Sequence, residues 1–171
     1  MTANDFCGRA LDLLGRPYDE VDCIGVVRIA ANIRCQGTNW LWRSHDSKGK
    51  YRYLVERMER PPLNKELRNG MLVFRVNWNF VPSGYTDKPN CYHVGVIWND
   101  SVIQSQTKEG VNIKPYDYNQ WDACGWLKQI TPDTVTDEPN YDTETGMQIE
   151  EKIDRIYMMV KELYERYSLV D

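Results

Sequence analysis

Two short stretches, far apart in the sequence, contain the residue types of a thiol nucleophile site. The first is Asp22-Cys23-Ile24-Gly25, which opens an apolar helical pattern. The second is Tyr92-His93-Val94-Gly95-Val96, which lies in a strand pattern and is followed by Gln104. A thiol, an imidazole that takes its proton and a polar group that orients the imidazole are the components of nucleophilic catalysis by cysteine.

Cys23 occupies a position that can activate a thiol. Asp22 is a natural N-cap, so Cys23 falls in the first turn of the helix, where the partial positive charge favours the thiolate. The alternative is that Cys23 is a small, buried apolar residue, which is a common role for a free cysteine. No cap precedes a helix start at the other four cysteines, Cys7, Cys35, Cys91 and Cys124.

His93 and Gln104 are connected by the expected pairing of two strands. If Asn99-Asp100 forms a two-residue hairpin turn, Gly95 faces Gln104 across the strands, and His93 is a diagonal neighbour of Gln104 on the same face. Gly95 has no side chain that could separate them. We therefore predict that Gln104 bonds one imidazole nitrogen and orients the other toward Cys23. A register shifted by one residue would place Gln104 on the opposite face.

The elements that must position these residues follow from the apolar patterns and turn signals. Thr2 can cap a first helix, Pro61-Pro62 can end a third one, and Leu67–Gly70 reads as a turn into a strand. Residues 37–50 read as a loop. We expect helices at residues 3–14, 23–34 and 51–60, and strands at 71–76, 91–98, 101–106, 111–114 and 125–130. This order predicts an α+β domain over residues 1–130, with helices packed on a small antiparallel sheet.

The C-terminal part of the chain differs in composition. Residues 131–146 contain five acidic residues, two prolines and no basic residue, which predicts a solvated linker. Residues 147–171 contain an amphipathic helix with apolar residues three and four positions apart. We expect this helix to pack on the domain or to form the seam of a homodimer.

Composition excludes several classes of protein. The chain has 171 residues, 42% of them apolar, so it suits one globular domain. The net charge of −4, without a cluster of basic residues, argues against a nucleic-acid partner. Five cysteines without a CxxC spacing, together with two histidines, argue against a zinc site and a disulfide framework, and no cofactor is expected. No signal peptide and no membrane span are visible.

Four motifs, in order and at similar spacing, resemble those of the NlpC/p60 family of cell-wall cysteine peptidases. The resemblance runs from about residue 5 to residue 130. The motifs are Gly15-Arg16-Pro17-Tyr18, Asp22-Cys23-Ile24-Gly25, the turn and strand from Leu67 to Phe74, and His93-Val94-Gly95-Val96 with Gln104 on the next strand.

The resemblance implies a papain-like (NlpC-type) α+β fold with Cys23 as nucleophile, His93 as base and Gln104 as the residue that orients the base. It also implies that Tyr18 and Asp22 lie beside the nucleophile and help to form the substrate site. The implied substrate is an amide bond in the stem peptides of peptidoglycan, cleaved without a metal or cofactor.

The chain departs from the family pattern at three positions. Ile24 replaces the usual serine after the nucleophile, Met71 replaces the usual aspartate after Gly70, and Gln104 stands where histidine is commoner. Because Ile24 replaces that serine, the sequence does not identify the exact substrate. The alternatives are the same fold with another acyl-transfer or amidase reaction, or a catalytically silent phage tail or structural module. A lone catalytic domain resembles phage and prophage members, so we expect synthesis in the cytoplasm and delivery to the wall by phage lysis or tail machinery.

Overall fold

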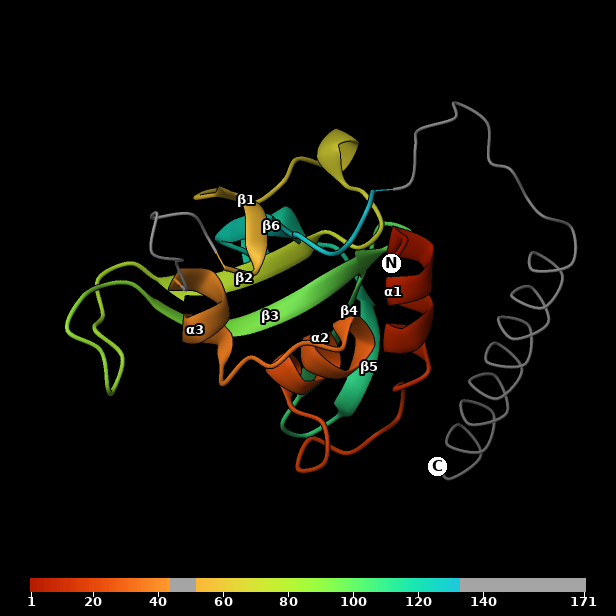
Figure 1. Cartoon of the computed structure of the whole chain (residues 1–171), viewed down its shortest axis with the longest axis horizontal. Coiled ribbons are helices and arrows are strands. Elements are labelled where there is room, and N and C mark those ends of the chain that lie inside the picture. Colours follow the sequence, from red (N-terminus) through yellow and green to blue (C-terminus); the bar gives the residue numbers. More distant parts are fainter. Residues whose placement is uncertain (44–51, 133–171) are drawn as a thin grey trace, which may run out of the picture. The chain divides into compact units, whose positions relative to one another are not determined.

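A six-stranded antiparallel sheet, covered on one side by helices, forms the framework of the protein (Figure 1). The computed structural model describes residues 1–43 and 52–132. The helices are α1 (Ala3–Leu11), α2 (Cys23–Ala31) and α3 (Thr38–Arg43). The predicted α+β class is confirmed, as is the packing of N-terminal helices on an antiparallel sheet.

The strands follow the spatial order β1-β6-β2-β3-β4-β5. Two short 3-10 helices, η1 (Asn64–Glu66) and η2 (Tyr118–Gln120), lie in the connections. The strands are β1 (Leu54–Met58), β2 (Leu72–Asn77), β3 (Asn90–Trp98), β4 (Ser101–Gln106), β5 (Gly110–Pro115) and β6 (Ala123–Leu127).

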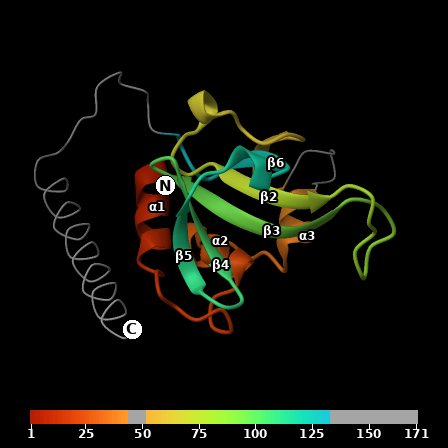
Figure 2. The ribbon, with the colours of Figure 1, turned by 180° about the vertical axis from the view of Figure 1, so that it is seen from behind.

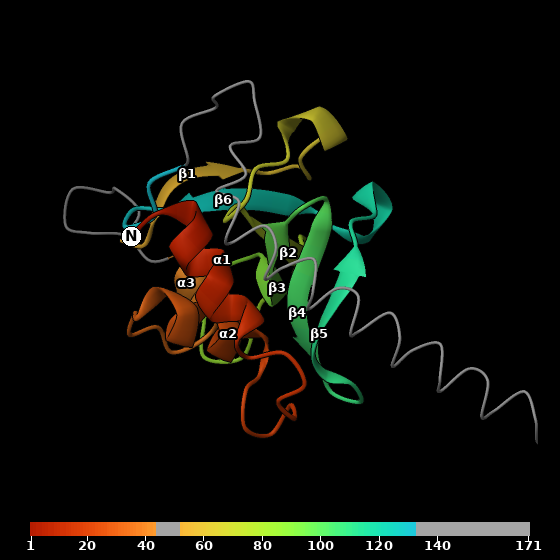
Figure 3. The ribbon, with the colours of Figure 1, turned by 90° about the vertical axis from the view of Figure 1, so that its right-hand side faces the viewer.

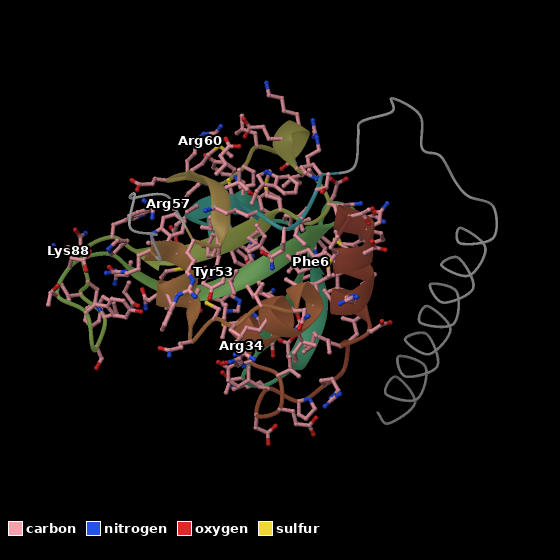
Figure 4. All side chains as sticks on the ribbon, viewed as in Figure 1. Phe6, Arg34, Tyr53, Arg57, Arg60 and Lys88 are labelled. Atoms are coloured by element: carbon pink, nitrogen blue, oxygen red, sulfur yellow. The ribbon has the colours of Figure 1, made fainter. Side chains whose placement is uncertain are left out.

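The larger hydrophobic core lies between the helices and the sheet. α1 and α2 lie on the same side of β3 and β4 (Figure 3). Phe6 is fully buried and points from α1 toward the sheet (Figure 4), where Phe74 and Val94 belong to the same core. α1 begins as expected, because the Thr2 hydroxyl accepts a hydrogen bond from the Asp5 amide in a capping box.

A smaller core lies on residues of the opposite parity in the same strands. Along β2, Leu72 belongs to the larger core and Val73 to the smaller one; Val96 and Ile97 divide in the same way along β3. This alternation is the two-residue period of a strand with a packed layer on each face. Trp121, just before β6, is a buried member of the smaller core.

The turn between β3 and β4 has the predicted geometry. Asn99 and Asp100 adopt φ of 44° and 56°, as a two-residue primed turn requires. Trp98 pairs with Ser101 and Val96 with Ile103, so the predicted register is confirmed.

The predicted helix at residues 51–60 is wrong. Leu54–Met58 is the edge strand β1, which pairs with β6 from Leu54↔Leu127 to Met58↔Cys124. The helical pattern of this charged stretch is overridden by the backbone bonds that β6 offers, a tertiary effect on local propensity. The expected loop at 37–50 contains α3 in its described part.

The loop between β2 and β3 extends away from the rest of the domain (Figure 2). It is joined to α3 through Arg43, whose guanidinium bonds the carbonyl and carboxylate of Asp87 and the carbonyl of Pro89. Asn39 adds bonds to the Asn90 side chain and the Cys91 amide. These contacts hold α3 against the start of β3.

The expected acidic linker and C-terminal helix lie outside the described residues, apart from positions 131 and 132. Thr131 forms a parallel bridge with Thr2, so the described domain closes on its own N-terminus. Within the described ranges, no helix has the length and apolar character needed to cross a membrane.

Candidate active site

Cys23 is the first residue of α2, at the position expected from the sequence. The carboxylate of Asp22 caps this helix by accepting a hydrogen bond of 2.6 Å from the Gly25 amide. A Cβ at Gly25 would lie 2.8 Å from that carboxylate oxygen, so a side chain there would disturb the cap. The Asp-Cys-x-Gly sequence therefore has a local structural reason: the glycine lets the aspartate close over the helix start.

The Cys23 thiol lies in a nearly closed environment. The residue is 7% exposed, and Sγ is 4.0 Å from the Thr38 hydroxyl of α3. Burial raises the pKa of the Cys23 thiol, while hydrogen bonds from the Val94 backbone and the Thr38 side chain oppose the rise. Desolvation is the largest of these effects, so the thiol form of Cys23 is favoured over the thiolate.

His93 and Gln104 form the contact predicted from the hairpin register. His93 Nε2 lies 2.7 Å from Gln104 Oε1, and Gln104 is 3% exposed. Because this amide oxygen can only accept, Nε2 donates its proton to it, which leaves Nδ1 as the basic nitrogen of the neutral ring. A buried amide therefore fixes both the tautomer and the orientation of the imidazole.

Trp121 packs against the ring of His93. Its indole stacks on the His93 ring with centroids 5.7 Å apart and planes at 16°. A Cβ at Gly95 would lie 3.1 Å from the Trp121 ring and 2.3 Å from a methyl of Val102. Sequence reasoning missed Trp121. The available signal was Gly95, because a glycine inside a strand often marks the close approach of another group.

Burial also sets the charge of the imidazole. It lowers the pKa of His93, the bond to Gln104 opposes that shift, and the nearby Arg75 guanidinium adds to it. His93 is consequently neutral at neutral pH. A neutral imidazole and a protonated thiol suit general-base chemistry, in which the proton moves as the sulfur attacks.

The other predicted site residues, Tyr18 and Asp22, are close enough to Cys23 to interact with it electrostatically. Burial raises the pKa of the Tyr18 phenol, and the Cys23 thiolate that forms at high pH and the Asp22 carboxylate raise it further. Cys23 and His93 share no hydrogen bond. Val94, which follows His93 on β3, is the strand residue whose backbone lowers the pKa of the Cys23 thiol.

No metal centre accompanies this site within the residues the structure describes, where no cluster of three or more histidine, cysteine or acidic side chains could hold an ion. All five cysteines have free thiols.

Comparisons with known proteins complete this description. No family model matches the chain, and no curated protein matches it. Among solved structures, the fold is similar to that of an NlpC/P60 family protein from Bacillus cereus, with 17% sequence identity and a TM-score of 0.47. The match covers 72% of this chain and 39% of the other, so the chain spans less than half the length of that protein.

Proposed function

We propose that this protein is a cysteine amidohydrolase that cleaves an amide bond in the stem peptides of peptidoglycan. The observation that carries the proposal is the His93 Nε2–Gln104 Oε1 bond of 2.7 Å, which orients an imidazole on β3, the strand that contacts the helix beginning with Cys23. A silent module has no need of a buried amide that fixes one histidine tautomer. The four sequence motifs and their order support peptidoglycan as the substrate.

The proton path follows from the tautomer. His93 Nδ1 takes the Cys23 thiol proton as Sγ bonds the carbonyl carbon, and the same nitrogen returns the proton to the departing amine. Water, deprotonated by His93, then hydrolyses the thioester and regenerates the thiol. The Cys23 amide, in the first turn of α2, has no intrahelical acceptor and is a donor for the developing oxyanion.

Ile24 bears on the choice of amide. It is 4% exposed and belongs to the larger core, so this position offers the substrate neither a hydroxyl nor an accessible side chain. A substrate group that a serine would bind must therefore be held elsewhere, with Tyr18 and Asp22 as candidates, since Tyr18 interacts electrostatically with both Asp22 and Cys23. The same observation favours, as a second candidate, cleavage of an amide outside the cell wall by the same residues.

The proposal is tested with purified peptidoglycan of known chemotype and mass analysis of the released fragments. We expect Cys23→Ala to lower the cleavage rate by at least about 10³-fold, because the nucleophile is lost. Cys35→Ala is the matched control: this buried cysteine bonds the Gly37 carbonyl and should retain wild-type activity.

Full activity of the folded Cys23→Ala protein would refute the mechanism. An added amine acceptor separates a peptidase from an acyl transferase. The measurement is the amount of the amine adduct relative to the amount of the hydrolysis product. Cleavage of non-wall amides alone would point to the second candidate.

A further inference from the structure

Arg75 lies directly beside the imidazole. It pairs with His93 across β2 and β3, so the two side chains leave the sheet on the same face. Trp121 contacts both: the indole stacks on His93 and lies 5.4 Å from the Arg75 guanidinium carbon. The cation and the imidazole therefore share one aromatic support, and the pairing breaks at a bulge immediately after Arg75.

The guanidinium has donors that the protein does not use. Its only hydrogen-bond acceptor among the described residues is the Gln120 side-chain oxygen, 3.1 Å from Nη2, and no carboxylate there lies within ion-pair distance. Nε is buried without a partner. A guanidinium has five N–H donors in a planar fork, and leaving them unpaired in a half-buried site costs free energy.

Gln120 holds the guanidinium in place without neutralising it. Its amide nitrogen donates to a carboxylate oxygen of Asp117, 3.0 Å away, which leaves the amide oxygen for Arg75. Asp122, the acid next to Trp121, is occupied by the Val76 amide at 2.7 Å. The acids on the adjoining segment are thus bonded to other groups, and the positive charge beside His93 stays unbalanced.

We propose that Arg75 binds a free carboxylate of the substrate, carried by a residue that flanks the scissile amide. A planar, permanently charged fork is the side chain that best matches a carboxylate. Cross-strand neighbours have Cβ atoms about 5 Å apart, and one extended residue spans about 3.5 Å. A carboxylate on Arg75 therefore lies within about one residue of the bond that His93 serves. The inference rests on the proposed function, which it refines by naming a determinant of specificity.

The test uses two synthetic tripeptides, alanyl-γ-glutamyl-lysine with the glutamyl α-carboxylate free, and the same peptide with that carboxylate amidated. Binding is measured by calorimetry in the Cys23→Ala protein, and cleavage in the protein with Cys23 intact. We expect the free-carboxylate peptide to bind and react roughly 10- to 100-fold better, as suits one charge-assisted contact. Arg75→Gln should abolish this preference, and Arg75→Lys should retain part of it, since the charge stays and the fork is lost.

Arg60→Gln is the matched control, because the Arg60 guanidinium is paired with Glu66 outside the site, and it should leave the preference unchanged. Equal or absent binding of the two peptides overturns the inference, and so does an equal loss for both peptides in Arg75→Gln. If no peptide is cleaved in a Cys23-dependent manner, the proposed function is refuted. The binding preference measured in the Cys23→Ala protein then still decides the role of Arg75. Near-ultraviolet circular dichroism, to which all six tryptophans contribute, shows whether each variant is folded.

Discussion

The two halves of the candidate site lie in different surroundings. Cys23 belongs to the larger core, near α3 and β3. Burial there raises the pKa of its thiol, and only the Thr38 hydroxyl and backbone groups lower that pKa. His93 stacks on a residue of the smaller core and has a buried amide and a guanidinium for neighbours. Burial disfavours the charged form on both sides, so it raises the pKa of the thiol and lowers that of the imidazole.

The surroundings of Cys23 and His93 bear on how the two groups would react together. Burial on both sides favours the neutral thiol and the neutral imidazole over a thiolate–imidazolium pair. On the strand side, Gln104 and Trp121 fix the orientation of the imidazole, and on the helix side, the start of α2 fixes the position of the sulfur. Changes on the strand side should therefore alter the pH dependence of the base, whereas changes on the helix side should alter the reactivity of the thiol.

The largest effect in this comparison is expected at Gln104. Gln104→Leu removes the acceptor of His93 Nε2, so the tautomer is no longer fixed, and kcat/KM should fall roughly 10- to 100-fold. Gln104 also raises the pKa of His93, so its loss should move the acidic limb of the pH–rate profile to lower pH. The base works only when unprotonated, and a lower pKa keeps it so in more acidic solution.

Gln104→Glu should shift the pH–rate profile in the opposite direction. A carboxylate at this position favours the imidazolium, so the acidic limb should move to higher pH. Identical profiles for the wild type, Gln104→Leu and Gln104→Glu would contradict the assignment of His93 as the base.

The next effect concerns the support of the imidazole. Gly95→Ala places a methyl against Val102 and the Trp121 ring, and overpacking of this kind costs about 1–3 kcal/mol of unfolding free energy. Gly8→Ala in α1 is the matched control: a Cβ there meets nothing within 4 Å, so helix propensity should stabilise the protein by about 0.5–1 kcal/mol. Urea unfolding measures both, and equal shifts would show that Trp121 does not pack closely over Gly95.

The smallest effect is expected on the helix side. Thr38 lowers the pKa of the Cys23 thiol through its hydroxyl, so Thr38→Val should raise that pKa and reduce the thiolate fraction at a given pH. Alkylation by iodoacetamide at pH 8 should slow by roughly two- to threefold, since a thiol is a weak hydrogen-bonding partner. Thr38→Ser keeps the hydroxyl and should react like the wild type; a loss in both variants would point to packing of α3 instead.

Local signals in the sequence determined much of the site. Asp22 as a cap before Cys23 predicts where α2 begins, because a cap acts within one turn. Asn99-Asp100 predicts the hairpin, since both residues tolerate the positive φ of a primed turn, and the register then places Gln104 beside His93. The NlpC/p60 resemblance supplied the expected substrate, which remains a proposal.

Tertiary structure alone decided the rest. The stretch that contains Leu54–Met58 reads as a helix until β6 offers its backbone groups. The raised pKa of Cys23, the stacking of Trp121 on His93 and the unbalanced charge of Arg75 arise among residues distant in sequence. Caps and turns are governed by a few consecutive residues, whereas desolvation and charge balance depend on everything that the folded chain brings within a few ångströms.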